Sequence, residues 1–293
     1  FVLASDVGLP RIKVLIAPRD LRQHAGRDAS ASEAFERLYE MRVSAGENLR
    51  AAPAAFWMGM RLASMGQVGR GGGWLARAQT LVESHGTDCA EQGYLKLPLV
   101  FRFNAAGDYP SAYKAAVAAY EIGDRHRDHE LSSLGRAFAG RSFNRQGRVA
   151  GGLPLVDEAM VAATSAELAP VVTGLIYCDA ISACQQIHAL DRAREWTTAL
   201  SSWCQAQPQV VPFAGACLIH RSEIMQLTGA WRDAFDEAQR ALAKLTPMRS
   251  AEAGPAFYQA GEIHRLRGEL ADAEQAYMQA SERGRDPHPG LAL

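Results

Sequence analysis

The stretch Thr228-Gly229-Ala230-Trp231 decides the fold, because variants of it recur along the 293-residue chain. In each variant a turn residue, the anchor, is followed two places later by a large apolar residue. The anchors are separated by 41, 40, 41, 41 and 39 residues. The six turns are Met65-Gly66-Gln67-Val68, Ala106-Gly107-Asp108-Tyr109, Gln146-Gly147-Arg148-Val149, Ile187-His188-Ala189-Leu190, Thr228-Gly229-Ala230-Trp231 and Arg267-Gly268-Glu269-Leu270. So regular an interval indicates an array of stacked structural repeats.

Small residues recur at fixed distances from the anchors. Five residues after the anchor stand Gly71, Ala112, Gly152, Ala193, Ala234 and Ala273. Twelve after it stand Ala78, Ala119, Ala159, Ala241 and Ala280, with the larger Leu200 in the fourth repeat. Seven residues before the anchor, four repeats have Gly59, Gly140, Ser222 and Gly261. Antiparallel helices approach closely only where side chains are small, and glycine ends a helix in a left-handed conformation without steric cost. We therefore expect each repeat to be a helical hairpin, with the large residue after the anchor filling the junction.

A single hairpin cannot bury its own apolar face, so the repeats must stack. The sequence predicts an all-α, right-handed superhelical solenoid of about six repeats over residues 51–293, preceded by an N-terminal segment, 1–50, with a degenerate helical repeat near 30–45. We expect Gly71-Gly72-Gly73 to delay the start of its helix to near Trp74, because glycine weakens helices. The predicted helix pairs are 51–66 with 68–84, 88–106 with 109–122, 128–146 with 149–165, 170–188 with 190–206, 211–228 with 231–245 and 251–267 with 270–284.

Composition argues for a neutral, cytoplasmic protein. The chain has 31 basic and 32 acidic residues and a formal net charge of -1, so no broad field favours nucleic acid or anionic lipid. Its five cysteines form no CxxC pair, and we interpret them as reduced core residues. Charges and prolines interrupt the apolar stretch 1–18, so we expect neither a signal peptide nor a membrane span. Position 1 is not Met, which leads us to expect a longer parent protein.

Several stretches carry a family likeness. They are Ala55-Phe56-Trp57-Met58-Gly59-Met60-Arg61-Leu62-Ala63, Gly73-Trp74-Leu75-Ala76-Arg77-Ala78, Leu155-Val156-Asp157-Glu158-Ala159-Met160, Val172-Thr173-Gly174-Leu175-Ile176-Tyr177-Cys178, Arg194-Glu195-Trp196-Thr197, His220-Arg221-Ser222-Glu223-Ile224 and Pro289-Gly290-Leu291-Ala292-Leu293. The pattern resembles the tetratricopeptide repeat (TPR), although its period exceeds the usual 34 residues. The longer period is similar to the repeat region of bacterial LuxR-type helix-turn-helix regulators and of class III adenylate or guanylate cyclases.

This resemblance implies a regulatory sensor or protein-interaction module that controls an attached output domain. DNA would be contacted only through a helix-turn-helix domain, which this sequence lacks. A free-standing scaffold for protein complexes and an enzyme with its site in the groove are the alternatives. The partner would be a protein, a peptide or a small effector, and a homodimer remains open. We expect no cofactor.

Motifs for catalysis or metal binding are not convincing. The sequence has no Gly-x-Ser-x-Gly elbow, no His-Glu-x-x-His helix and no phosphate-binding glycine loop. We interpret residues 124–130 as a loop in which Asp128 caps the next helix, rather than as a metal site. His220 with Glu223, and His264 with Glu262, suit hydrogen bonds between helices better than acid–base chemistry. The five tryptophans are expected to be core residues.

In tetratricopeptide folds the first helix of each pair lines the groove, at positions thirteen, ten, six, three and two before the anchor. The resemblance therefore places Phe56, Met60, Phe101 and Asn104 at an apolar end of the groove. It predicts a polar remainder, where a peptide would be held by amide and charged groups. The candidate binding residues there are Arg141, Asn144, Arg145, Ser182, Gln185, Gln186, Glu223, Gln226, Tyr258, Glu262 and Arg265.

Overall fold

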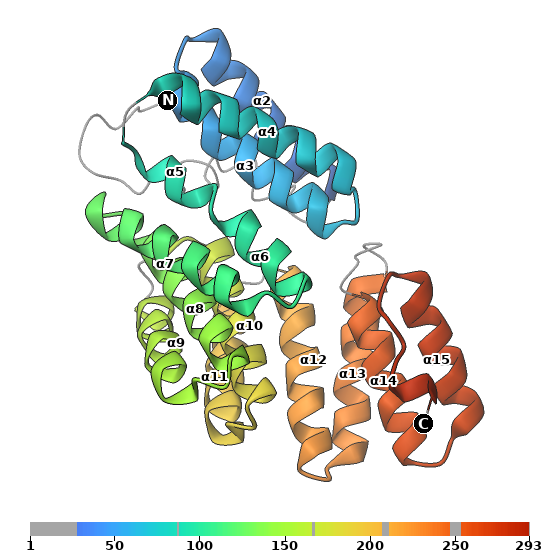
Figure 1. Ribbon diagram of the computed structural model, residues 1–293. Coiled ribbons are helices and arrows are strands. Elements are labelled where there is room, and N and C mark those ends of the chain that lie inside the picture. The colour runs from blue at the N-terminus through green and yellow to red at the C-terminus, as the bar shows by residue number, and fades with distance from the viewer. Residues whose placement is uncertain (1–27, 87, 166–167, 207–210, 247–252, 293) are drawn as a thin grey trace.

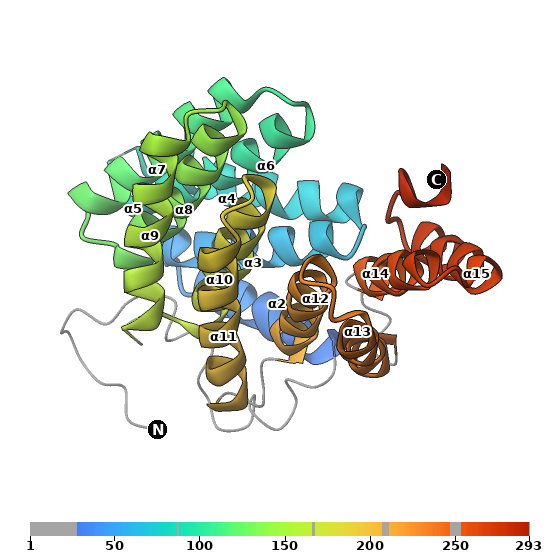
Figure 2. The same cartoon turned by 90° about the horizontal axis from the view of Figure 1, so that it is seen from below.

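The computed structural model describes residues 28–86, 88–165, 168–206, 211–246 and 253–292, and this part of the chain is helical, without strands. Residues 1–27 lie outside the described residues. Six helical hairpins follow one another in chain order (Figure 1), and Figure 2 shows the same order from below. No helix in the described ranges is long and apolar enough to cross a membrane. The predicted all-α solenoid of paired helices is confirmed.

The hairpins pair a first helix with the helix that follows it. Before them lies α2 (Asp28–Ser44), which packs on α3. The hairpins are α3 (Asn48–Ser64) with α4 (Val68–His85), α5 (Ala90–Tyr94) and α6 (Leu97–Ala105) with α7 (Tyr109–Arg125), α8 (His129–Arg145) with α9 (Val149–Thr164), α10 (Pro170–Gln186) with α11 (Leu190–Ala206), α12 (Val211–Leu227) with α13 (Trp231–Leu245), and α14 (Ala253–Leu266) with α15 (Leu270–Glu282). A short 3-10 helix, η2 (Gly290–Ala292), follows.

The anchors have the predicted left-handed backbone. Gly66, Gly107, Gly147, Gly229 and Gly268 have φ between 75° and 82°. The fourth anchor, His188, adopts the same conformation at φ 58° even though it carries a Cβ. The turn geometry therefore belongs to the repeat itself, and glycine is the residue that adopts it at least cost.

The small residues before and after each anchor face one another across the hairpin. A Cβ built on Gly59 would lie 2.9 Å from the carbonyl oxygen of Gly71, and one built on Gly71 would lie 2.8 Å from that of Gly59. Gly140 and Gly152 meet in the same way, at 2.6 and 2.7 Å. These contacts confirm that small side chains permit the close approach of the paired helices.

Two helix predictions are wrong. The predicted helix 88–106 is interrupted after Tyr94, and α6 begins at Leu97 with Pro98 in its first turn. Proline lacks an N–H and is best accommodated in the first turn of a helix, which is where Pro98 lies in α6. Conversely, α4 begins at Val68 and passes through the three glycines without delay. Tertiary packing of Gly71 against α3 outweighs the low helix propensity of glycine.

In three repeats the large residue after the anchor is exposed and does not fill the junction, which corrects another prediction, whereas Tyr109, Val149 and Leu190 are half-buried. Val68 is 71% exposed and Leu270 is 68% exposed, because this position is the first residue of the second helix. Trp231 occupies it too and is exposed rather than in the core. Trp57 and Trp74 are buried as predicted, whereas Trp196 and Trp203 are half-buried against the core.

The hydrophobic core is divided unevenly along the solenoid. One continuous cluster extends from Ala55 to Cys217. The last two hairpins contain smaller clusters, one joining Leu218 with Ala256 and another joining Ala234 with Ile263. Cys217 of α12 still belongs to the large cluster, and a small cluster of Cys184, Ala193 and Ile224 joins α10, α11 and α12, so the large core gives way to smaller ones within α12.

Candidate functional site

The first helices of successive hairpins pack directly on one another. α8 lies against α10, α10 against α12, and α12 against α14. Among the described residues, no comparably extensive contact joins the successive second helices α9, α11, α13 and α15. The stack is therefore closest together along the first helices, which places them on its inner side.

One side of α10 remains accessible. Val171, Leu175, Cys178, Ser182 and Gln185 are half-buried, while most other residues of this helix are buried. Their spacing of three or four residues places them along one side of the helix. This side is apolar near the start of α10 and polar near its end.

We define the inner face as the accessible residues along this side of α8, α10, α12 and α14. They are Arg141, Arg145, Val171, Leu175, Cys178, Ser182, Gln185, His220, Glu223, Gln226, Tyr258, Glu262 and Arg265. All the predicted polar groove residues lie on the inner face except Asn144, which is buried, and Gln186, which lies exposed at its margin. Their role in binding stays a prediction.

Asn144 is a correction to the predicted site. Its side chain is buried, and a Cβ built on Gly152 of α9 would lie 2.1 Å from its Oδ1 atom. The residue thus packs inside the third hairpin. The spacing rule alone cannot distinguish a position at the edge of the inner face from one in the interface between the two helices of a hairpin. Its neighbour Arg145 is exposed and donates a hydrogen bond to the Tyr109 hydroxyl at 2.6 Å.

The inner face also contains residues that the sequence analysis did not select. Leu175 and Cys178 stand thirteen and ten residues before the anchor His188, so the same spacing reaches them. Their apolar and thiol side chains do not indicate a polar site, so only their spacing points to them. Val171 and His220 fall outside the spacing rule, and their helical periodicity with Leu175 and Glu223 was the available signal.

Polar pairs connect neighbouring first helices across the inner face. The pairs are Arg141 Nη1 with Asp179 Oδ1 at 2.7 Å, Gln185 Nε2 with Glu223 Oε2 at 2.8 Å, and Gln259 Nε2 with Gln226 Oε1 at 2.6 Å. Four of the predicted groove residues are therefore already bonded to an adjacent helix. They hold the stack together as well as presenting polar atoms on its inner side.

The pair between α8 and α10 is strongly asymmetric. The Asp179 side chain is 5% exposed and that of Arg141 is 33% exposed. Burial raises the pKa of Asp179, and the Arg141 guanidinium lowers it only in part. The Asp179 carboxylate in turn raises the pKa of Arg141. Asp179 depends on this partner, because its other oxygen, Oδ2, is buried without a hydrogen bond.

A charged group on α12 adjoins the second pair. His220 Nδ1 lies 3.1 Å from Glu223 Oε2, so the two residues do pair, but within α12 and not between helices as predicted. Burial alone would lower the pKa of His220, but hydrogen bonds with Cys178 and Glu223 outweigh it and raise the pKa to about 10. For Glu223 burial opposes ionisation, yet the bond to His220 lowers the pKa of the carboxyl. His220 and Glu223 thus form an ion pair at neutral pH.

The chain's own C-terminal segment lies against the last part of the inner face. Tyr277 donates a hydrogen bond to Glu262 Oε1 at 2.5 Å, and Arg265 donates one to Glu262 Oε2 at 2.9 Å. Gly290 in η2 is buried here, and a Cβ on it would lie 2.3 Å from Glu262 Oε1. Arg285 stacks over the Tyr258 ring at 4.5 Å. The open part of the inner face therefore runs from α8 to α12.

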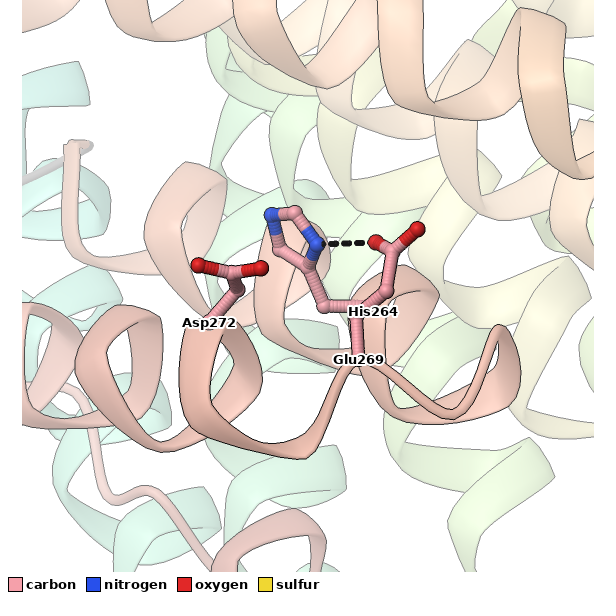
Figure 3. A group of neighbouring side chains, drawn as sticks. All are labelled: His264, Glu269 and Asp272. Carbon is pink, nitrogen blue, oxygen red and sulfur yellow. Dashed lines mark hydrogen bonds and ion pairs between the residues drawn. The ribbon is translucent and has the colours of Figure 1, made fainter.

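A second cluster lies at the turn between α14 and α15. Figure 3 shows His264 beside Glu269, with Asp272 on the following helix, and one ligand atom from each lies within 4.8 Å of the others. His264 Nδ1 lies 2.6 Å from Glu269 Oε2, so its partner is Glu269 and not Glu262, which corrects that prediction. Arg267 binds the other Glu269 oxygen at 2.8 Å. The Arg267 guanidinium already supplies a positive charge beside Glu269. We therefore interpret the cluster as polar contacts that stabilise the turn between α14 and α15, and not as a metal site.

The predicted loop 124–130 is shorter than expected, because α7 continues to Arg125 and α8 begins at His129, but its predicted helix cap is confirmed. Asp128 accepts a hydrogen bond from the Leu131 N–H at 3.0 Å and so caps α8. It also accepts one from the Tyr94 hydroxyl at 3.2 Å. Tyr94 and Asp128 line a mainly apolar pocket between the first two hairpins, together with Phe56, Trp57 and Glu91. Its cavity volume is only about 20 Å³, which is about the room that one water molecule needs.

Comparison with solved structures identifies the architecture. The chain has a tetratricopeptide-like fold. It is similar to aspartyl phosphate phosphatase F from Bacillus subtilis, with a TM-score of 0.55 and 14% identity over 93% of this chain and 68% of that one. It is also similar to the kinesin light chain TPR-like repeats from Podospora anserina, with a TM-score of 0.51 and 13% identity over 68% and 97% of the two chains.

A third similar structure is a STAND-type signal transduction ATPase with a tetratricopeptide repeat sensor from Pyrococcus horikoshii. Its TM-score is 0.50 at 14% identity, covering 93% of this chain and 41% of the ATPase. Comparison with protein-family models and with curated protein sequences finds no match. At these identities the similarity concerns the fold alone.

Proposed function

We propose that the chain is a protein-interaction module that binds an extended peptide segment of its partner along the inner face, from α8 to α12. The observation that carries this proposal is the accessible side of α10, where Val171 and Leu175 precede Ser182 and Gln185. A bound peptide needs apolar contacts for its side chains and hydrogen-bonding groups for its backbone. This side offers both within one helix length.

The finer context follows from the sequence resemblance. We propose that the module is the regulatory sensor of a bacterial signalling protein, either a LuxR-type regulator or a class III cyclase, and acts in the cytoplasm. The ATPase from Pyrococcus horikoshii is described as carrying a tetratricopeptide repeat sensor, which is a precedent for this arrangement. A helix-turn-helix or cyclase sequence in the same reading frame supports the sensor, and a reading frame without either supports a free-standing scaffold.

A small effector is the second candidate ligand. The apolar pocket around Phe56 and Trp57 is the place proposed for it, and the side chains that line this small pocket would have to move apart to admit a ligand. A peptide and an effector would then occupy different hairpins. Chemical-shift changes confined to the first two hairpins on addition of a small molecule would distinguish this candidate from a peptide on α10.

The peptide proposal is tested by selection from a displayed random peptide library, followed by affinity measurement with fluorescence polarisation. Ser182→Arg places a long charged side chain on the inner face without removing one of the polar pairs. Gln239→Arg is the matched control, on the exposed side of α13. We expect at least about tenfold weaker binding for Ser182→Arg, a change of roughly 1.4 kcal/mol, and unchanged binding for the control. Equal affinities for both variants would overturn the proposal.

A further inference from the structure

The pocket between the first two hairpins is bounded by three aromatic rings. Phe56 and Trp57 of α3 meet edge to face, with their ring centroids 5.1 Å apart. Phe56 and Tyr94 of α5 meet in a similar way, with their centroids 5.5 Å apart. All three rings line the pocket. The face of an aromatic ring carries negative potential and attracts cations, so this lining suits a cationic group as well as an apolar one.

Two acidic side chains also line the pocket, whereas no basic residue of the described chain takes part in the lining. Glu91 is 5% exposed. Asp128 is half-buried and accepts hydrogen bonds from two neutral groups, the Tyr94 hydroxyl and a backbone N–H. The basic residues on either side of it in the sequence, Arg127 and His129, are exposed and do not line the pocket. The two carboxylates therefore give the pocket a negative charge.

The Tyr94 hydroxyl lies among these charges. Burial raises the pKa of Tyr94 well above its usual value, and the negative charges of Asp128, Glu130 and Glu91 raise it further. The Glu130 carboxylate is buried and accepts a hydrogen bond from the Ala169 N–H at 2.8 Å. Charges attract each other more strongly away from bulk water. A positive group that enters the pocket is therefore stabilised by carboxylates that water screens only in part.

We propose that this pocket binds the primary ammonium group of an amine effector, held by the two lining carboxylates and the three aromatic rings. This inference rests on the effector candidate of the proposed function and names its chemical class. A whole effector requires the lining side chains to move apart, but the cavity of about 20 Å³ already has room for one group of the size of water, as an ammonium group is. The rest of the amine is expected beside Pro53 and Leu95, the half-buried apolar residues of the lining.

Other ligands suit the pocket less well. A hard metal cation takes six or more oxygen ligands, whereas this lining is mainly apolar and contains two carboxylates. A quaternary ammonium group is larger than the cavity and has no N–H to donate to a carboxylate. A neutral alcohol gains nothing from the negative charge. The three N–H donors of a primary ammonium group, by contrast, can bond to carboxylate oxygens while its alkyl chain contacts apolar side chains.

The test uses propylammonium chloride as the probe, with 1-propanol as the neutral counterpart of the same length and potassium chloride as the metal counterpart. Nitrogen-15-labelled tryptophan gives five indole signals in the intact chain, and the Trp57 signal is assigned from its absence in Trp57→Phe. We expect propylammonium alone to shift the Trp57 signal, in a saturable manner, while the signals of Trp196, Trp203 and Trp231 in other hairpins stay in place.

Equal shifts with 1-propanol would leave a ligand site in the first two hairpins but overturn its cationic class. Equal shifts with potassium chloride would overturn the choice of an amine. No shift of the Trp57 signal with any of the three would overturn the pocket as a site. The peptide affinity measured with Ser182→Arg is a separate readout, so a failed amine titration beside a normal peptide result rejects the amine site alone.

Charge-removing variants of the lining sharpen the result. Asp128→Asn keeps a side-chain acceptor that can cap α8, and Glu91→Gln keeps the shape of its side chain. We expect each variant to weaken propylammonium binding at least about tenfold, because one attractive charge is lost. Glu121→Gln is the matched control, since it removes a charge from the exposed side of α7 and should leave binding unchanged. Unchanged affinity in both lining variants contradicts the proposal.

Discussion

Gly71 and Gly72 are adjacent in α4 but have opposite surroundings. A Cβ on Gly71 would lie 2.8 Å from the Gly59 carbonyl oxygen, whereas a Cβ on Gly72 would meet nothing within 4 Å. We expect Gly71→Ala to lower the free energy of unfolding by about 1–3 kcal/mol, because the backbones of α3 and α4 must separate. Gly72→Ala should raise it by about 0.5–1 kcal/mol through higher helix propensity. Urea denaturation of the two variants checks both signs, and a shared sign would refute the close contact.

At the same scale, His220 makes stability depend on pH. Its folded pKa of about 10 lies above the ordinary value of 6.5, so the protonated imidazole stabilises the fold fully below pH 6.5. This contribution is lost as the pH rises through 10. We expect the stability difference between the wild type and His220→Gln to shrink steadily from pH 6.5 to pH 10.

The measurement is urea denaturation of both proteins across this pH range. His85→Gln, at the exposed end of α4, is the control and should show the same pH dependence as the wild type. A difference between wild type and His220→Gln that stays constant over the range would show that His220 is not held in its charged form. At acid pH, Glu223 determines how stability changes. Because its pKa is lowered in the folded protein, its contribution to the free energy of unfolding is lost only as the pH falls.

At the scale of the helix, two aspartates cap their helices with unequal consequences. Asp108 accepts a hydrogen bond from the Ser111 N–H, and Asp128 accepts one from Leu131 N–H and a second from the Tyr94 hydroxyl. We expect Asp108→Ala to cost about 1 kcal/mol and Asp128→Ala about 2 kcal/mol, since the latter also leaves Tyr94 without this partner. Thermal melts rank the two variants. Equal costs would mean that the tyrosine contact adds nothing to the cap.

Helix positions were largely predictable because the anchor turns are local. A left-handed residue that is followed directly by a new helix leaves a short sequence signal, and even His188 kept the period when glycine was absent. The failures have a different origin. Pro98 could be placed in a helix interior or in a first turn, and only packing decides which. Likewise, the tolerance of three glycines in α4 depends on a contact with Gly59 from another helix.

For the molecule as a whole, Arg141 and Asp179 show how the hairpins are fastened together. We expect Arg141→Ala to cost roughly 2 kcal/mol, which allows for the partial exposure of Arg141, because it leaves the Asp179 carboxylate buried and uncompensated. Changing both residues, Arg141→Met with Asp179→Leu, should recover most of this loss. A double-mutant cycle measures the coupling, and additive effects would argue against a direct pair.

The inner face was predictable only in outline. Helical spacing reached the correct side of the first helices, since that spacing is a property of the repeat. It could not tell that Asn144 is buried against Gly152, or that Gln185 and Glu223 bond to each other. Nor could it foresee that the segment around Gly290 lies against Glu262. These features depend on contacts with neighbouring repeats and with the segment around Gly290, which does not follow the repeat pattern.

The one-sided stacking of the hairpins has a mechanical consequence. First helices touch their successors, whereas second helices make no comparably extensive contacts with one another within the described ranges. Successive hairpins are also joined where each first helix packs on the second helix before it, as α12 does on α11 and α14 does on α13. The side of each junction that lacks such contacts is the one between successive second helices. We therefore expect a bend of the solenoid to open this outer side first and to leave the contacts between first helices in place.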